Sequence, residues 1–468
     1  MVSTSKQIPT ITFLGATQTV TGSRFLVTCG QIKVLVEAGL FQGSREIRER
    51  NWSAFPVDPA KLDAVILTHA HLDHCGYLPV LVKQGFTNPV YCTKYTERLA
   101  EVILRDSGRI QEEDANFATR QGYSRHKNPK ALYSEQDAID ALALFSTVAF
   151  RTRREIAPEV FVTFYPSGHI LGSSFVVLEI CGARILFTGD MGRKVHPVLI
   201  SPDDFPSGHF DAVVTESTYG DRLHSEPTTA FAREISRTIN EGGCVLIPAF
   251  AVDRTEVILI KLRELMQAGQ IPHVPIYADS PMALTSLDFY REAIDLGAVE
   301  IRQDVVNQWQ GRDPFNPGTL RELRTVEQSK SLNKKHEPSI LVSASGMATG
   351  GRVVHHLARM LPDPKNTVML VGFQAQGTRG RLLEQGEKQI KIHGNWVSVR
   401  AKIFKEESFS VHGDALELTQ WLSQGEKPDT VFVVHGETGA AEIFAKHLNS
   451  VLGWKAVVPK TDEAFALE

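Results

Sequence analysis

A run of three histidines and one aspartate directly follows an apolar stretch near the start of the chain. The run is HAHLDH (residues 69–74), and the preceding DAVILT reads as a buried strand. Imidazole and carboxylate groups together are the ligands of Zn²⁺ and similar metals. On an extended segment His69 and His71 point the same way, and Asp73 and His74 can serve a neighbouring ion. This density of ligand types favours a metal site over a polar surface loop.

Three further candidate ligands each close an apolar strand: His169 in PSGHILGSS, Asp190 in FTGDMGR and His435 in TVFVVHG. A single histidine at a strand end is more often an ordinary hydrogen-bonded residue than a ligand. The recurrence of this placement, each time before glycine or a turn, makes all three candidates. Layered folds assemble their sites at the edge where strands end.

The composition limits the classes of function. The chain has 468 residues, of which 42% are hydrophobic and 22% charged, and its length predicts two or three domains. The formal net charge is -4, so a general basic excess that coats nucleic acid is excluded. Any nucleic-acid contact must come from a local groove, with metal ions supplying positive charge.

Cysteine use and hydropathy indicate the compartment. The chain has five scattered cysteines that form no CxxC pair, at positions Cys29, Cys75, Cys92, Cys181 and Cys244. We therefore expect neither a disulfide framework nor a thiolate zinc site, and we expect a reducing compartment. No run of about eighteen apolar residues occurs, so we expect no membrane contact. The expected location is the cytoplasm.

The order of the predicted elements indicates one domain inserted into another. In residues 1–217 short strands followed by helices occur twice, which predicts a layered α/β sandwich. In residues 218–394 strands alternate with helices at the spacing of a parallel, Rossmann-like sheet. From residue 395 short strands return, the first at 397–404, and we expect residues 395–468 to complete the first domain.

The motifs resemble those of the β-CASP family of metallo-β-lactamase nucleases, which includes the pre-mRNA 3′-end cleavage endonuclease and bacterial and archaeal relatives. The resemblance rests on THAHLDHCGYLP, SGHILGSS, FTGDMGR, ESTYGDR, DSPMA, SASGMATGGRV, GFQAQGTRGR, FSVHGD and VVHGET, which stand in family order. It implies a metallo-β-lactamase αββα sandwich carrying an inserted β-CASP cap domain.

Carried over by position, the resemblance implies two Zn²⁺ ions. One would be bound by His69, His71 and His169, the other by Asp73, His74 and His435, with Asp190 bridging the two. The same ligands could hold manganese or iron. RNA-processing members carry a histidine at position 435, where the DNA-repair members carry valine, and this favours RNA as the substrate.

The resemblance also places an acid at Glu216 and a histidine at His412 near the metals. A hydroxide bridging the ions would be the nucleophile, with Asp73 orienting it. His412 would protonate the leaving ribose oxygen while Glu216 holds its tautomer. The alternatives are a further metal ligand or a surface histidine for His412, and a capping or turn carboxylate for Glu216.

One position departs from the family pattern, because Glu37 stands where the family usually has aspartate. This acid is expected to orient a metal-bound histidine, and its extra methylene could shift the ligand geometry. Two Gly-rich stretches follow strands and open helices, and their backbone N–H groups could receive phosphate. We consider phosphate contacts by Ser345, Gly346, Arg352 and Arg379, and the alternative is that these Gly-rich turns only connect a strand tightly to a helix.

The sequence therefore predicts a zinc-dependent ribonuclease that hydrolyses RNA phosphodiester bonds, as an endonuclease, a 5′-3′ exonuclease or both. Single-stranded RNA would be held through phosphates and stacking. One alternative is a small-molecule ester or thioester hydrolase, which would need no long insertion. The other is a non-catalytic RNA-binding scaffold, which typically loses ligands that this chain retains. The oligomeric state stays open, a homo-oligomer included.

Overall fold

The computed structural model describes residues 7–121, 129–224, 229–334 and 337–467. The chain divides into two compact units. The first unit comprises Met1–Leu223 together with His412–Glu468, and the second comprises His224–Val411. Each unit has its own sheets and its own core.

The first unit contains two seven-stranded sheets that pack face to face. Side chains from both sheets share one apolar core, in which the rings of Phe13 and Phe432 lie 4.8 Å apart. One sheet has the order β22 (Glu463–Ala466), β1 (Thr10–Phe13), β2 (Phe25–Cys29), β3 (Ile32–Val36), β4 (Ala64–Ile66), β5 (Val90–Cys92) and β6 (Phe145–Thr147). The other has the order β21 (Ala456–Val457), β20 (Thr430–Val433), β11 (Ala212–Thr215), β10 (Ala183–Phe187), β9 (Ser174–Ile180), β8 (Val160–Pro166) and β7 (Arg154–Ala157).

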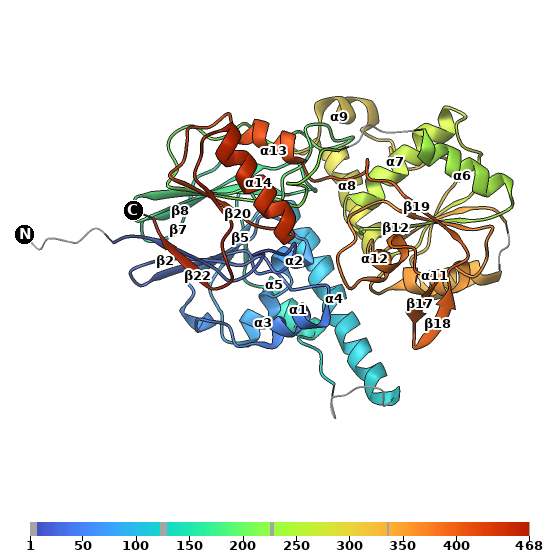
Figure 1. Ribbon diagram of the computed structural model, residues 1–468, viewed down its shortest axis with the longest axis horizontal. Helices are drawn as coiled ribbons and strands as arrows, with labels where there is room; N and C mark the ends of the chain where they lie inside the picture. Colours follow the sequence, from blue (N-terminus) through green and yellow to red (C-terminus); the bar gives the residue numbers. More distant parts are fainter. Residues whose placement is uncertain (1–6, 122–128, 225–228, 335–336, 468) are drawn as a thin grey trace, which may run out of the picture. The chain divides into compact units, whose positions relative to one another are not determined.

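Helices cover the outer faces of this sandwich. Trp421 and Phe444 pack against Phe175 on the outer side of the second sheet, and Figure 1 shows α13 and α14 on that side, with α3 and α5 beyond the other sheet. The helices of the unit are α1 (Arg45–Glu49), α2 (Leu72–Cys75), α3 (Leu78–Lys83), α4 (Lys94–Gln121), α5 (Glu135–Leu142), α13 (Ala415–Leu422) and α14 (Thr438–Val451), with the 3-10 turns η1 (Arg50–Trp52) and η2 (Pro59–Lys61). The expected αββα sandwich is confirmed.

The second unit is built on a six-stranded sheet in which every pairing is parallel. Its order is β14 (Leu320–Glu322), β13 (Ile276–Ala278), β15 (Ile340–Ala344), β12 (Val245–Ala249), β16 (Thr367–Leu370) and β19 (Lys402–Lys405). The helices are α6 (Ala230–Asn240), α7 (Arg254–Gln267), α8 (Pro281–Leu296), α9 (Gln303–Trp309), α10 (Val326–Ser331), α11 (Arg352–Met360) and α12 (Arg379–Glu384), with the 3-10 turn η3 (Leu332–Lys334). A separate hairpin joins β17 (Gln389–Ile392) to β18 (Asn395–Ser398). This is the Rossmann-like arrangement that the alternation of strands and helices predicts.

The chain leaves the second unit later than residue 394, where the sequence places the end of the insertion. The run expected as one strand at 397–404 is two strands, because β18 pairs with β17 and β19 pairs in parallel with β16. Residues 395–411 therefore belong to the second unit, and the first unit resumes at His412. The apolar alternation of this run shows no break that would have revealed the division.

The expectation of no disulfide is wrong for one pair of cysteines. Cys29 ends β2 and Cys181 follows β9, so their bond ties the two sheets of the sandwich together. The remaining cysteines are free thiols (Cys75, Cys92 and Cys244). Cysteine use therefore no longer supports a reducing compartment. Within the described ranges, no helix is long and apolar enough to cross a membrane.

Candidate metal centre

The HAHLDH run lies where β4 leaves its sheet. The strand is buried along its whole length, and the chain then turns so that His71 becomes the N-cap of α2. The backbone N–H groups of His74 and Cys75 both donate to the carbonyl of His71. Asp73 and His74 thus stand on a short helix rather than on the extended segment that the sequence predicts. Tight packing fixes this helix, because a Cβ at Gly39 would lie 1.7 Å from the Asp73 carbonyl oxygen.

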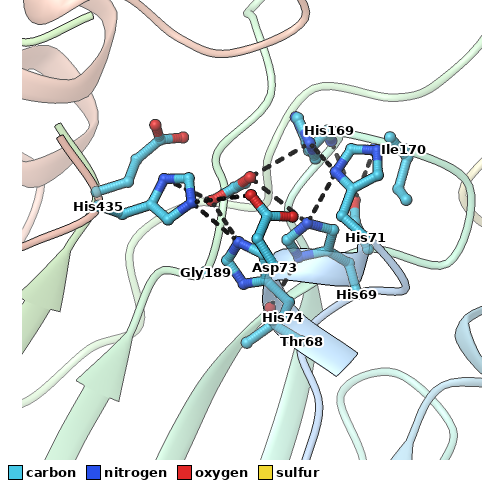
Figure 2. A network of polar contacts seen from close by, with 12 residues as sticks. Thr68, His69, His71, Asp73, His74, His169, Ile170, Gly189 and His435 are labelled. Atoms are coloured by element: carbon cyan, nitrogen blue, oxygen red, sulfur yellow. Dashed lines mark hydrogen bonds and ion pairs between the residues drawn. The ribbon is translucent and has the colours of Figure 1, made fainter. Parts of the chain in front are cut away.

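Three histidines gather on one side of the centre (Figure 2). His71 Nδ1 lies 3.1 Å from His69 Nε2 and 3.3 Å from His169 Nε2. His169 comes from the loop between β8 and β9, and His69 and His169 are fully buried. A neutral imidazole has one ring nitrogen with a free lone pair, so three rings gathered this closely can direct lone pairs at a common point. They form the group expected for the first ion.

The second group lies beside the first and contains Asp73, His74 and His435. His74 Nε2 lies 3.2 Å from His435 Nε2, which in turn lies 3.6 Å from Asp73 Oδ2. His435 lies two residues after the end of β20 at a positive φ of 49°, a strained backbone conformation for a non-glycine residue. Figure 2 shows His435 and His74 facing each other across from the first group.

Asp190 stands between the two groups and directs one carboxylate oxygen at each. Oδ2 lies 3.5 Å from His69 Nε2 and 3.6 Å from His169 Nε2. Oδ1 lies 3.3 Å from His74 Nε2 and 3.4 Å from His435 Nδ1. This is the position that a carboxylate bridging two ions would take.

These residues fit a divalent metal centre. Asp190 Oδ1 is buried yet accepts no hydrogen bond from any described residue. Leaving such an oxygen in a buried site without a donor or a cation is costly. Nitrogen and carboxylate donors that converge in this way are what a metal ion requires. His69, His71, His169 and Asp190 form one group of ligand atoms mutually within 4.8 Å, and Asp73, His74 and His435 form another.

The protonation states follow from burial and charge. Burial lowers the pKa of His69, His74 and His169 well below the ordinary value, so these rings are neutral, the form that binds metal. Burial raises the pKa of Asp190 to about 7. Burial also opposes charge on His435, but Asp190 and Asp73 outweigh it and raise its pKa to about 10. Without a metal ion, Asp190 and Asp73 stabilise a proton on His435, and a bound metal ion would neutralise these carboxylates in its place.

His412 and Glu216 form a pair at the edge of the centre. His412 Nδ1 lies 3.1 and 3.2 Å from the two carboxylate oxygens of Glu216. The Met191 backbone N–H donates to the same carboxylate at 2.6 Å. Burial opposes charge on His412, yet Glu216 raises its pKa above the ordinary value. The pairing fixes the proton on Nδ1, so Nε2 is the nitrogen that can exchange a proton with a substrate.

Glu37 and two threonines orient the histidines. The Thr68 backbone N–H donates to Glu37 Oε1 at 3.0 Å, and Glu37 Oε2 lies 3.5 Å from His74 Nδ1. Thr68 Oγ1 lies 3.0 Å from His69 Nδ1, and Thr218 Oγ1 lies 3.1 Å from His435 Nδ1. Such contacts fix which ring nitrogen faces a metal. Neither threonine was predicted from the sequence, because the only signal of each is its nearness to motif residues.

The four residues expected to contact phosphate lie in the second unit. The Arg352 guanidinium donates to Asp279 at 2.7 Å and to the carbonyl of Leu323 at 2.9 Å. The Arg379 guanidinium donates to the carbonyls of Lys391, Ala348 and Thr349. Both arginines therefore brace the loops around them. Ser345 Oγ and Thr349 Oγ1 lie 2.9 Å apart in the turn that follows β15, next to Gly346.

Three family models match the chain. Residues 23–218 match the metallo-β-lactamase superfamily, residues 255–383 the β-CASP domain, and residues 396–459 the Zn-dependent metallo-hydrolase RNA specificity domain. The chain is 36% identical to "Ribonuclease TTHA0252" of Thermus thermophilus, over 90% of this chain and 92% of that protein. It is 34% identical to an "RNase J-like protein" of Methanocaldococcus jannaschii, over 91% and 92% of the two chains. The protein therefore belongs to the β-CASP family of metallo-β-lactamase-fold, metal-dependent hydrolases.

More distant similarity extends along the whole chain. "Transcription termination factor FttA" of Methanocaldococcus jannaschii is 28% identical over 98% of this chain and 72% of its own length. The crystal structure of a protein of unknown function from Enterococcus faecalis V583 matches with a TM-score of 0.52 at 14% identity, over 98% of this chain and all of that chain. The latter match shows the fold alone.

Proposed function

We propose that the protein is a zinc-dependent ribonuclease that hydrolyses phosphodiester bonds of single-stranded RNA, by internal cleavage, 5′-3′ removal of nucleotides or both. The observation that carries the proposal is the placement of Asp190, whose two oxygens face two separate groups of ligand atoms. A pair of ions 3.5–4 Å apart (roughly) is typical of phosphodiester hydrolysis. The names of the two ribonuclease relatives described above, and His435 in place of valine, support RNA as the substrate.

The proposed ligand sets are His69, His71 and His169 for one Zn²⁺, and Asp73, His74 and His435 for the other, with Asp190 shared. Bound ions would supply the charge that turns a water into a hydroxide nucleophile near neutral pH and stabilises the attacked phosphate. Glu37, Thr68 and Thr218 keep the histidine rings in their binding tautomers.

His412 is the proposed general acid. Its Nδ1 is held by Glu216, and its side chain is 18% exposed while the Glu216 side chain is fully buried. The raised pKa favours the protonated ring, whose Nε2–H can be given to the leaving ribose oxygen. Asp73 is the proposed group that orients the attacking oxygen. We also propose a cytoplasmic location, which the ribonuclease relatives support although the Cys29–Cys181 bond does not. Phosphate contacts are proposed at Ser345 and Gly346, in the turn that follows β15.

The test is cleavage of a 5′-labelled single-stranded RNA, beside the matched DNA, by zinc-loaded protein. Asp73→Ala/His74→Ala should abolish cleavage. His209→Ala is the matched control, because His209 is half exposed and pairs with Asp429 away from the ligand set. Release of labelled mononucleotide identifies 5′-3′ removal, and longer labelled fragments identify internal cuts. Elemental analysis should find two zinc ions per chain, and RNA that stays intact with both ions bound would refute the proposal.

A further inference from the structure

The β17–β18 hairpin of the second unit has one buried and one exposed face. Lys391 pairs with Trp396 and Ile390 with Val397, and paired residues of antiparallel strands share a face. Ile390 and Ile392 are buried in the core of the unit, with Val397 packed against them. On the opposite face Trp396 is 69% exposed beside the exposed Lys391. Exposed indoles are candidates for recognition surfaces because they offer a large flat face, and here the indole stands beside a cation.

The hairpin is also a local concentration of positive charge. Residues 388–405 contain five lysines and arginines and no aspartate or glutamate, in a chain whose net charge is -4. Lys402 is paired with Glu234, and Lys405 with Glu384. Within the described part of the chain, the other three cations make no ion pair (Lys388, Lys391 and Arg400).

The turn of the hairpin adds a pair of stacked imidazole rings. His393 stacks on His355 of α11, with ring centroids 4.4 Å apart and planes 27° from parallel, and both residues are exposed. His393 and Gly394 both have positive φ, the pairing of a two-residue type I′ turn that matches the twist of the strands. Figure 1 shows the hairpin extending from the second unit. The surface is therefore built on a tight, fixed turn.

We propose that the exposed face of this hairpin is a binding surface for single-stranded RNA, additional to the metal centre of the first unit. A base stacks on Trp396, and Lys391, which pairs with Trp396 on the same face, neutralises a neighbouring phosphate. Single-stranded nucleic acid alternates flat bases with negative charges, and a planar ring beside unpaired cations without acids complements it. An acidic protein could also pair with the cations, but single-stranded nucleic acid is the partner that repeats a flat ring and a negative charge at every unit. The inference rests on the proposed function in taking RNA as the substrate.

The test measures the affinity of a fluorescently labelled RNA of about twenty uridines for the full chain in EDTA, where no cleavage occurs. Trp396→Ala should raise the Kd roughly tenfold, which corresponds to about 1.4 kcal/mol and lies in the range for one stacked base. Lys391→Ala should reduce the slope of log K against log salt by about 0.7. Trp52→Ala is the matched control, because Trp52 is 60% exposed in the first unit, and it should leave the Kd unchanged. All three side chains are exposed, so unchanged melting temperatures confirm folding.

The outcomes separate this inference from the proposed function. If wild-type protein cleaves RNA but Trp396→Ala binds it as tightly as Trp52→Ala does, the hairpin inference fails and the ribonuclease stands. If Trp396→Ala weakens RNA binding but the zinc-loaded wild-type protein cleaves no RNA, the hairpin inference stands and the ribonuclease proposal fails. If Trp396→Ala changes the oligomeric state and leaves RNA affinity unchanged, the face pairs with a second copy of the chain, and the inference is overturned.

Discussion

Reduction of the Cys29–Cys181 bond should destabilise the first unit. Cys29 lies at the end of β2 in one sheet, and Cys181 lies in the turn between β9 and β10 of the other. Residues between them include the HAHLDH run and His169. The bond therefore closes a loop that contains much of the proposed metal centre, and the two cysteines are 152 residues apart in sequence.

The size of the effect follows from that separation. For a loop of 152 residues, the chain-entropy relation gives about 5 kcal/mol at 25 °C. This is an upper value, because a denatured chain keeps some structure that the bond no longer has to constrain. The unit spans residues 1–223 and 412–468, so its entropy of unfolding is about 0.6 kcal/mol/K. The melting temperature of the first unit should fall by up to about 8 °C on reduction.

Thiol titration and thermal unfolding test this directly. Protein purified without reductant and denatured should titrate three thiols, those of Cys75, Cys92 and Cys244, and reduced protein should titrate five. The melting temperature of wild-type protein should depend on reductant, and that of Cys29→Ala/Cys181→Ala should not. Five titratable thiols before reduction, or a melting temperature indifferent to reductant, would refute the reasoning.

Three further outcomes follow from individual side chains. Glu37→Asp shortens the acid that contacts both Thr68 and His74, and should weaken zinc affinity about tenfold in a chelator competition, whereas unchanged affinity would remove Glu37 from the orienting role. Gly39→Ala places a Cβ 1.7 Å from the Asp73 carbonyl oxygen, so it should lower the free energy of unfolding in denaturant by about 1–3 kcal/mol. It should also lower the number of metal ions bound per chain. A variant with normal stability and two bound ions would contradict this packing. Burial raises the pKa of Glu256 well above its ordinary value, so the folded state binds the proton more tightly than the unfolded chain does. The stability of the folded state is therefore fully kept below the unfolded pKa of about 4.3 and falls as pH rises toward the folded pKa. The melting temperature of Glu256→Gln should therefore exceed that of the wild type by more at pH 8 than at pH 5. Parallel pH profiles of the two proteins would show that ionisation of Glu256 does not destabilise the fold.

The positions of the candidate ligands were predictable because of where the strands end. His69 follows β4, Asp190 follows β10 and His435 follows β20, and each strand is an apolar run that the sequence shows plainly. Strand ends at one edge of a sandwich lie close together, so residues far apart in sequence meet there. The structure brings all seven proposed ligands into two adjacent groups. The separation of these groups by Asp190 was available only through the resemblance, since no spacing in the sequence encodes it.

Features that depend on contacts between distant strands were not predictable. Cys29 and Cys181 meet because two facing sheets place β2 opposite the β9–β10 turn, and neither cysteine has a neighbour in sequence that marks the pairing. The return to the first unit at His412 rather than residue 395 has the same origin. The sequence pattern of β19 does not show whether the strand belongs to a sheet of the first unit or to the sheet of the second. Its parallel pairing with β16 places it in the second unit.

Glu37 shows how the departure from the family pattern is accommodated. The residue follows β3 at a positive φ of 66°, and its backbone N–H donates to the Ile66 carbonyl at the end of β4. From this anchored backbone the longer side chain reaches the Thr68 backbone N–H with one oxygen and comes near His74 with the other. Burial raises the pKa of Glu37, so the carboxylate needs the charge of a nearby cation to be ionised. A glutamate held in this way can orient His74 as the shorter acid does, and its ionisation is coupled to the filling of the metal centre.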